Sequence, residues 1–208
     1  MSTARGLEGV VATTSSISSI IDSVLTYRGY DIDELADNAS FEEVVYLLWE
    51  GELPKKEQLD ELTKALAENA DIPQELIETM KKWPVDKIHP MAALRTAISN
   101  LALYDEQADA MDEEANRQKA IKLQAKIPTI VTAFSRIREG KEPVAPRKDL
   151  SFAANFLYML KGKEPDEIAV RAFNKALVLH ADHELNASTF TARVCVATLS
   201  DVYSGITA

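Results

Sequence analysis

The chain has 208 residues, of which 46% are apolar and 27% charged, a composition typical of a globular protein. The formal net charge of −10 argues against a surface that binds nucleic acids or anionic membranes. No run of 18 apolar residues occurs, which excludes a transmembrane helix, and residues 1–9 lack the apolar stretch of a secretory signal. Cys195 is the only cysteine, which excludes an internal disulfide and fits a reducing cytoplasm.

The N-terminal region predicts a little β-structure before the first helix. The segment Gly6–Thr14 contains several β-branched residues and gives a weak strand signal. The Ser- and Ile-rich residues 15–21 are ambiguous between strand and helix. We interpret Tyr27–Tyr30 as a turn that leads into a short helix at Ile32–Leu35.

The next helix has clear signals at both ends. Ser40 and Glu43 form the pattern of a capping box, in which each side chain bonds the backbone N–H of the other residue. Gly51 stands where a left-handed C-cap is needed, and Pro54 follows it. These residues predict a helix that ends at Gly51.

Proline and glycine mark the helices in the middle of the chain. Pro73 and Pro90 each suit the first position of a helix, where the missing N–H costs nothing. Residues 112–139 predict one long helix that is kinked at Pro128 and ended by Gly140.

The C-terminal third is also predicted to be helical. Ser151 caps a helix, and Pro165 opens another that runs towards His180. The inward side chains expected in the first of these helices are Phe152, Phe156, Leu157 and Leu160. Residues 187–208 read as a further helical stretch with little charge. Because strands do not alternate with helices, a doubly wound sheet is excluded and the fold class is all-α.

Three histidines are the first candidates for chemistry: His89, His180 and His183. The last two share a helical face at spacing i, i+3, so a metal site is conceivable. Zinc would need further ligands, and di-iron bundles use paired Glu-x-x-His motifs, which this sequence lacks. We therefore favour histidines that pack against the core or cap helix ends, and we expect no metal.

Other reactive side chains give weaker signals. Cys195 lies between Val194 and Val196 without an adjacent histidine to lower its pKa, so we expect a small buried apolar residue. His89 precedes Pro90 at the start of a helix and suits capping. The arginines that could pair with carboxylates, by default in structural ion pairs, are Arg28, Arg95 and Arg193.

Four motifs, spread in order through the chain, resemble the citrate synthase family, and most closely its smaller bacterial and archaeal members. The most specific is His180–Thr189, with the sequence HADHELNAST, which is followed by LSDVYSG at Leu199–Gly205. The others are LTYRGYDI at Leu25–Ile32, FEEVVYLL at Phe41–Leu48 with GELP at Gly51–Pro54, and HPMAALR at His89–Arg95.

The resemblance implies an all-α, multi-helical large domain with a short N-terminal β segment. It implies that residues 1–208 are the N-terminal part of that domain, and that the small domain and the rest of the large domain lie outside this chain. The implied reaction is a Claisen-type condensation of acetyl-CoA with oxaloacetate, which yields citrate and CoA. It requires no cofactor, because the coenzyme A thioester is itself the substrate.

Carried over by position, the resemblance makes His183 a residue that hydrogen-bonds oxaloacetate. Asn186 and Ser188 match a polar pair that supports the neighbouring catalytic histidine. The catalytic residues themselves are expected downstream of Ala208, so the 208-residue chain alone should be inactive. The family further implies a cytoplasmic homodimer joined through large-domain helices, in which the stretch from Ala187 onward would take part.

Two alternatives stay open at this point. A 2-methylcitrate synthase would use propionyl-CoA, and one extra methylene is discriminated by only about 1–3 kcal/mol in an apolar pocket. A non-catalytic helical protein could bind an anion or a partner through the same scaffold.

Overall fold

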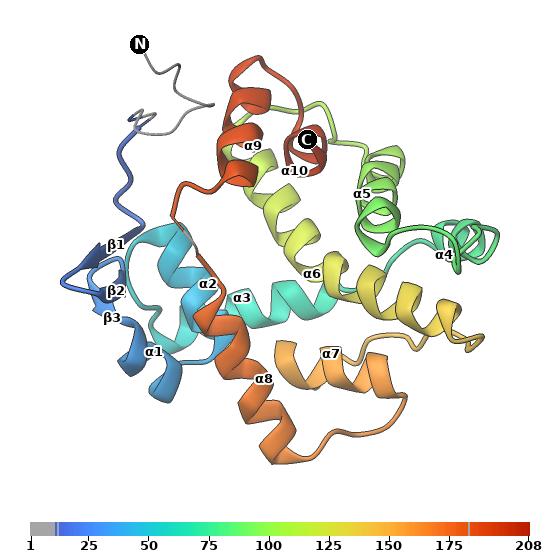
Figure 1. Cartoon of the computed structure of the whole chain (residues 1–208), viewed down its shortest axis with the longest axis horizontal. Coiled ribbons are helices and arrows are strands. Elements are labelled where there is room, and N and C mark those ends of the chain that lie inside the picture. Colours follow the sequence, from blue (N-terminus) through green and yellow to red (C-terminus); the bar gives the residue numbers. More distant parts are fainter. Residues whose placement is uncertain (1–10, 12, 183) are drawn as a thin grey trace, which may run out of the picture.

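A small antiparallel sheet precedes a series of helices in the computed structural model (Figure 1). The structure describes residue 11, residues 13–182 and residues 184–208. The strands are hydrogen-bonded in chain order: β1 (Ser18–Ile21), β2 (Val24–Tyr27) and β3 (Tyr30–Asp31). The helices are α1 (Ile32–Asn38), α2 (Phe41–Glu50), α3 (Lys56–Glu68), α4 (Gln74–Lys81), α5 (Pro90–Leu101), the 3₁₀ helix η1 (Ala102–Tyr104), α6 (Glu113–Arg138), α7 (Phe152–Lys161), α8 (Glu167–Leu179), α9 (Ala187–Ala197) and α10 (Val202–Thr207). The all-α class with a short N-terminal β segment is confirmed.

The β segment lies later in the chain than its sequence signal suggested. Most of Gly6–Thr14 falls outside the described residues, and its described residues are not in a strand. The first strand is instead β1, which pairs with β2 across a two-residue turn at Asp22 and Ser23. Both turn residues have positive φ, 51° and 68°, the backbone pattern of tight hairpins. This turn lacks the usual Asn-Gly signature, so the hairpin was not recognisable from the sequence.

Local capping rules correctly placed several helix ends. The Ser40 and Glu43 capping box is present, and Gly51 adopts the left-handed conformation, with φ of 93°. Asp112 caps α6, Pro128 lies inside it, and the ribbon of this helix changes direction about halfway along (Figure 1).

Other boundaries differ from the sequence expectation. Pro73 is the N-cap of α4 rather than its first residue, and α8 begins at Glu167, two residues after Pro165, because the Asp166 side chain accepts from the Ala169 N–H. The inward face predicted for α7 is only partly correct: Phe152 packs against the first core, but all four predicted side chains are only partly buried. The face that the core covers is Ala153, Ala154, Asn155 and Met159.

The expected helical stretch at residues 187–208 is two helices. Leu199 adopts a left-handed φ of 64° between them, and the Asp201 side chain caps the second helix by accepting from the Ser204 N–H at 2.9 Å. Because Asp201 satisfies the amides of a new helix start, the chain turns before α10 rather than continuing α9.

Helix α6 joins two hydrophobic cores. Its residues Ile121 and Ala125 belong to a cluster built mainly on α1, α2 and α3. Its residues Leu123, Ile130 and Phe134 belong to a second cluster with α4, α5 and α10. Figure 1 shows this helix running between the two groups of elements.

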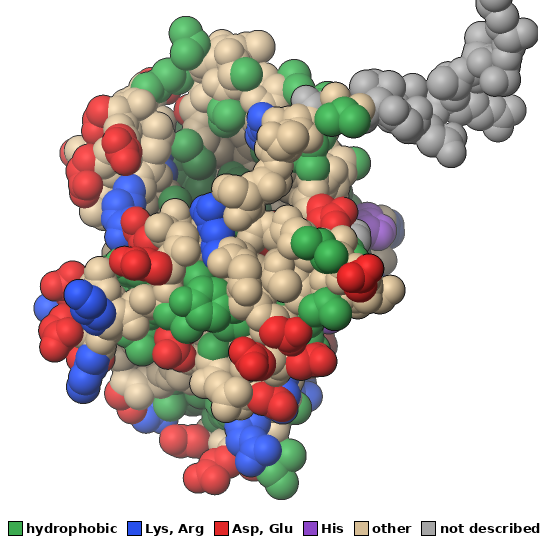
Figure 2. Space-filling model, turned by 90° about the vertical axis from the view of Figure 1, so that its left-hand side faces the viewer, with side chains coloured by type: hydrophobic (Ala, Val, Ile, Leu, Met, Phe, Trp, Pro, Cys, Tyr) green, Lys and Arg blue, Asp and Glu red, His purple; other side chains and the backbone are tan. Residues whose placement is uncertain are grey.

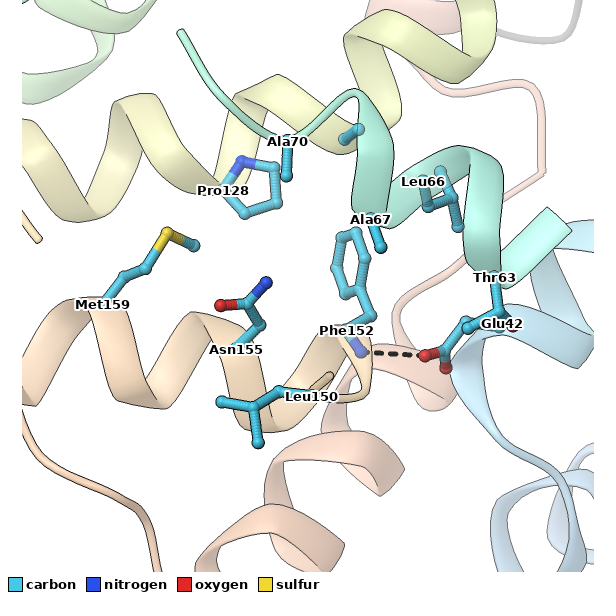
Figure 3. Close-up of a pocket in the computed structure, with 11 residues that line it drawn as sticks. Glu42, Thr63, Leu66, Ala67, Ala70, Pro128, Leu150, Phe152, Asn155 and Met159 are labelled. Carbon is cyan, nitrogen blue, oxygen red and sulfur yellow. Dashed lines mark hydrogen bonds between the residues drawn. The ribbon is translucent and has the colours of Figure 1, made fainter. Parts of the chain in front are cut away.

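A small cavity lies where α2, α3, α6 and α7 meet (Figure 3). Its volume is about 30 Å³, which suits a water molecule or two rather than a substrate. The buried Glu42 carboxylate lines it and accepts from the Phe152 N–H at 2.8 Å. This contact gives the buried Glu42 side chain a hydrogen-bond donor at the start of α7 and ties that helix to α2.

A buried carboxylate anchors α10 to the rest of the fold. The Asp105 side chain is 5% exposed and accepts from Lys122 Nζ at 2.8 Å and from the Tyr203 hydroxyl at 2.7 Å. Burial alone would raise the pKa of Asp105, but the hydrogen bonds from Lys122 and Tyr203 outweigh it and lower the pKa. The ionised carboxylate therefore stabilises the folded state.

We expect Asp105→Asn to lower the free energy of unfolding by about 1.5–3 kcal/mol at pH 7, the scale of hydrogen bonds to a charged group. Because the folded-state pKa is lowered, the wild-type contribution is complete above the ordinary aspartate pKa of about 4 and is lost as the pH falls towards the lowered value. Urea unfolding at pH 7 and at pH 3 should show the difference between variant and wild type shrinking in acid.

The matched control is Asp60→Asn, which removes an exposed ion pair with Lys56 and should change stability little at either pH. An Asp105→Asn effect that is the same at both pH values would contradict the assigned role of the carboxylate.

Candidate functional site

The loop between α8 and α9 carries the most specific sequence motif. Helix α8 ends at Leu179, and His180 is its C-cap, with Nδ1 donating to the Ala176 carbonyl at 2.7 Å. His89 caps the start of α5 by accepting from the Met91 N–H through Nδ1 at 3.2 Å. The capping interpretation is therefore confirmed for these two histidines. His183, the predicted oxaloacetate ligand, lies outside the described residues.

No metal-binding cluster occurs among residues 11, 13–182 and 184–208, where no three His, Cys, Asp or Glu side chains gather. The His180 side chain is hydrogen-bonded to the Ala176 carbonyl, and the Asp182 carboxylate accepts from Ser18. Among the same described residues, no helix is long and apolar enough to cross a membrane.

Residues from the N-terminal hairpin hold Asp182, which directly precedes His183 in the chain. The Tyr27 hydroxyl donates to the Asp182 carbonyl at 3.1 Å and accepts from the Asp182 N–H at 3.2 Å. Ser18 Oγ donates to the Asp182 carboxylate. Burial raises the pKa of Tyr27, so its hydroxyl keeps its proton at neutral pH. Sequence reasoning missed these two residues, because no local signal links positions about 155 residues apart.

Asn186 and Ser188 lie at the beginning of α9. The Asn186 side chain is its N-cap, with Oδ1 accepting from the Thr189 N–H at 2.8 Å. Ser188 is exposed one residue into the helix and faces a cleft. The structure thus places both residues next to the loop, while their predicted support of a catalytic histidine stays a prediction.

The cleft beside Ser188 lies between α5, α9 and α10 and has a volume of about 680 Å³. Its charged or titratable lining side chains are those of His89 and Arg95, and no acidic side chain is among its described lining residues. The other lining residues have uncharged side chains: Met91, Ala92, Leu94, Ile98, Ile127, Ser188, Thr189, Ala192, Gly205, Ile206, Thr207 and Ala208.

This local charge contrasts with the acidic protein as a whole. The chain has a net charge of −10, and Figure 2 shows Asp and Glu spread over one face among Lys and Arg rather than gathered in one patch. A cleft with an arginine and no acidic side chain can attract an anion locally even though the distant field is repulsive.

The remaining sequence candidates have structural roles that differ from expectation. Arg28 donates to the Leu48 carbonyl at 2.9 Å and to Ser16 Oγ at 3.0 Å, and Arg193 donates to Thr13 Oγ1 at 3.3 Å. Within the described part of the chain these two arginines bond neutral oxygens, and the expected ion pairs are not found there. Cys195 is only partly buried, because α9 has neighbours on few sides within this chain.

Sequence and structure comparisons agree on one family. A family model described as "Citrate synthase, C-terminal domain" matches residues 6–208. Citrate synthase 2 of Bacillus subtilis is 67% identical over 208 residues, covering 100% of this chain and 56% of the relative. A 2-methylcitrate synthase of Mycobacterium tuberculosis is 42% identical over 205 residues, covering 98% of this chain and 51% of the relative.

Solved structures share the fold. The citrate synthase of Pyrobaculum aerophilum superposes with a TM-score of 0.90 at 40% identity, covering 97% of this chain and 52% of that chain. A ternary complex of the Thermoplasma acidophilum citrate synthase with carboxymethyl coenzyme A and oxaloacetate gives a TM-score of 0.89 at 27% identity, covering 99% of this chain and 55% of that chain.

A helical scaffold in which Ser188 and Thr189 of the HADHELNAST motif line a cleft that also contains Arg95, together with these matches, defines the class: the chain belongs to the citrate synthase family. It spans about half the length of the curated relatives it matches.

We expect Asn186→Ala to destabilise α9 by about 1 kcal/mol, because the first-turn amides lose their acceptor. Asn186→Asp keeps a capping oxygen and should retain the helix. Amide hydrogen exchange of residues 187–191 measures the difference directly. Equal loss of protection in both variants would show that the side-chain NH₂ group, rather than the capping oxygen, is what the native structure uses.

Proposed function

We propose that this chain is part of a citrate synthase that condenses acetyl-CoA with oxaloacetate to give citrate and CoA. The observation that carries the proposal is 67% identity, over the whole chain, to a citrate synthase. In the proposed arrangement residues 1–208 form the N-terminal part of the large domain. The small domain and the remaining large-domain helices come from the sequence that the longer relatives possess.

The proposed reaction has several steps, and residues from both halves of such an enzyme contribute to them. A base removes an α proton from the acetyl group, and the resulting enolate carbon bonds to the ketone carbon of oxaloacetate. The ketone oxygen takes up a proton, and water then cleaves the thioester and releases CoA. A thioester α proton is too weakly acidic for a free carboxylate, so the developing enolate oxygen needs a positioned donor in a dry site.

The contribution of this chain to that reaction is substrate binding. We assign His183 the hydrogen bond to oxaloacetate, on the strength of its place in the HADHELNAST motif. Asn186 and Ser188 support the neighbouring catalytic histidine, which we place in the remaining half together with the base. The Arg95 guanidinium in the lining of the cleft supports an anionic substrate near α9.

Of the two acyl-CoA substrates considered, we favour acetyl-CoA. The relative at 67% identity is a citrate synthase, whereas the 2-methylcitrate synthase is 42% identical. The Thermoplasma enzyme was solved in complex with oxaloacetate and a coenzyme A derivative, which are ligands of that protein. We extend these two substrate classes to this chain, with no cofactor beyond the coenzyme A thioester and with the cytoplasm as the compartment.

A homodimer through large-domain helices completes the proposal. The side chains of Val194, Val196 and Leu199 are 51%, 42% and 77% exposed around α9. Isolated exposed apolar residues are ordinary, but three within six positions leave apolar surface in water on more than one side of this segment. Burial of such a surface in an obligate interface of roughly 2,000 Å² or more would remove it from water.

In the full-length enzyme, His183→Ala should lower kcat/KM for oxaloacetate by about 1.5–3 kcal/mol, the scale of a hydrogen bond to a charged group. His183→Asn keeps a donor N–H and should recover part of the loss. Steady-state kinetics with each substrate varied decides the matter. An unchanged kcat/KM for oxaloacetate in His183→Ala would remove this residue from the binding site.

For the interface, Val194→Glu should yield monomers, because a charge in an apolar contact loses its hydration without gaining a partner. The matched control is Ile168→Glu on α8, where the native side chain is 79% exposed and the dimer should persist. Light scattering of the full-length proteins gives the mass. A dimer of normal mass in Val194→Glu would place α9 away from the interface.

A further inference from the structure

We propose that the N-terminal hairpin is a positioning element for the substrate-binding loop at residues 180–186, acting through Tyr27 and Ser18. The proposal rests on the proposed function, because it assigns a supporting role at the same site. Figure 1 shows the sheet beside the segment that leaves α8, although the two are far apart in the sequence.

The Tyr27 hydroxyl satisfies both backbone groups of Asp182. It donates to the carbonyl at 3.1 Å and accepts from the N–H at 3.2 Å, which uses its single proton and one of its lone pairs. Asp182 lies between two helices, so neither group has a helical partner. Tyr27 is 0% exposed and belongs to the first hydrophobic core, which holds its ring and therefore its hydroxyl in place.

Ser18 holds the side chain of Asp182. Its hydroxyl donates to Asp182 Oδ2, and the Glu184 N–H donates to that oxygen at 2.8 Å. Ser18 and Tyr27 face each other across the β1–β2 ladder, and directly opposed residues point to the same face of a sheet. One rung of the hairpin thus supplies two anchors to one loop residue.

The hairpin is itself attached to the helical core. The Arg28 N–H extends the hairpin by donating to the Ile17 carbonyl at 2.7 Å, and the Arg28 guanidinium ties it to α2 by donating to the Leu48 carbonyl at 2.9 Å. Within the loop, Glu184 adopts a φ of 56°, a strained conformation for a residue other than glycine. Such a conformation persists only where the surroundings impose it, and the anchored Asp182 supplies that constraint.

These contacts predict a local effect rather than a general loss of structure. Removing the Tyr27 hydroxyl leaves two backbone groups of Asp182 without their partner while the ring still fills the core. The loop then samples other conformations, and oxaloacetate must select the competent one, which raises its apparent dissociation constant. The proposed arrangement gives this loop a contact with oxaloacetate and no direct contact with the acyl-CoA.

The test compares Tyr27→Phe with Tyr46→Phe in the full-length enzyme. Both variants remove a hydroxyl from a buried tyrosine, but Tyr46 lies within α2, whereas the Tyr27 hydroxyl bonds Asp182. We expect Tyr27→Phe to raise KM for oxaloacetate about tenfold, the scale of one or two lost hydrogen bonds, with KM for acetyl-CoA within about twofold of wild type. Tyr46→Phe should leave KM for oxaloacetate near the wild-type value.

Ser18 provides a second variant pair. Ser18→Ala removes the donor to Asp182 and should raise KM for oxaloacetate by about three- to tenfold, whereas Ser18→Thr keeps the hydroxyl and should restore most of the affinity. A rise of equal size in both variants would show that the hairpin surface, and not the hydrogen bond, was disturbed, and would overturn the role of Ser18.

Hydrogen exchange separates this inference from the proposed function. In the 208-residue chain, Tyr27→Phe should speed exchange of the backbone amides at positions 182–186, while the amides of α2 and α6 keep their protection. Unchanged exchange in the loop would overturn the positioning role whatever the enzyme does. A wild-type enzyme that does not use oxaloacetate would refute the proposed function, and one that does, with the same KM in Tyr27→Phe, would refute the positioning.

Discussion

The burial of α6 along both of its sides is the constraint on which the other elements depend. Its side chains enter the cluster built on α1, α2 and α3 and also the cluster built on α4, α5 and α10. Because one helix serves both clusters, it fixes how the two groups of elements sit relative to each other. Pro128 lies inside this helix, where it removes one backbone hydrogen bond.

Polar contacts attach the functional segments to this apolar frame. Asp105 holds α10 in place through hydrogen bonds with Lys122 and Tyr203. Glu42 accepts a hydrogen bond from the start of α7, and Tyr27 donates one to Asp182 in the loop. Each contact satisfies a buried group that would otherwise cost free energy, so each stabilises the fold and also fixes the position of the segment it holds. The segments expected to meet substrate are therefore held by hydrogen bonds, and the scaffold by apolar burial.

The distribution of charge also distinguishes the cleft from the rest of the protein. The molecule is acidic overall, while the cleft at α5, α9 and α10 carries His89 and Arg95 without an acidic side chain among its described lining residues. For the proposed substrates, both anionic, a local basic wall within an acidic protein limits binding to one place. The exposed apolar side chains of α9 lie beside that wall, which suits a helix that serves a site on one side and a subunit contact on the other.

The sequence by itself determined the helical class, the family and those helix ends that a nearby side chain caps, such as Ser40 with Glu43 and Ser151 with Ala154. These features depend on hydrogen bonds between residues three or four apart, so the local sequence contains their cause. Tertiary structure alone decided the β1–β2 hairpin, the break between α9 and α10 and the buried face of α7. It also decided the attachment of Tyr27 to Asp182, because that contact joins residues 155 positions apart and forms only after packing of the core has brought the hairpin and the loop together.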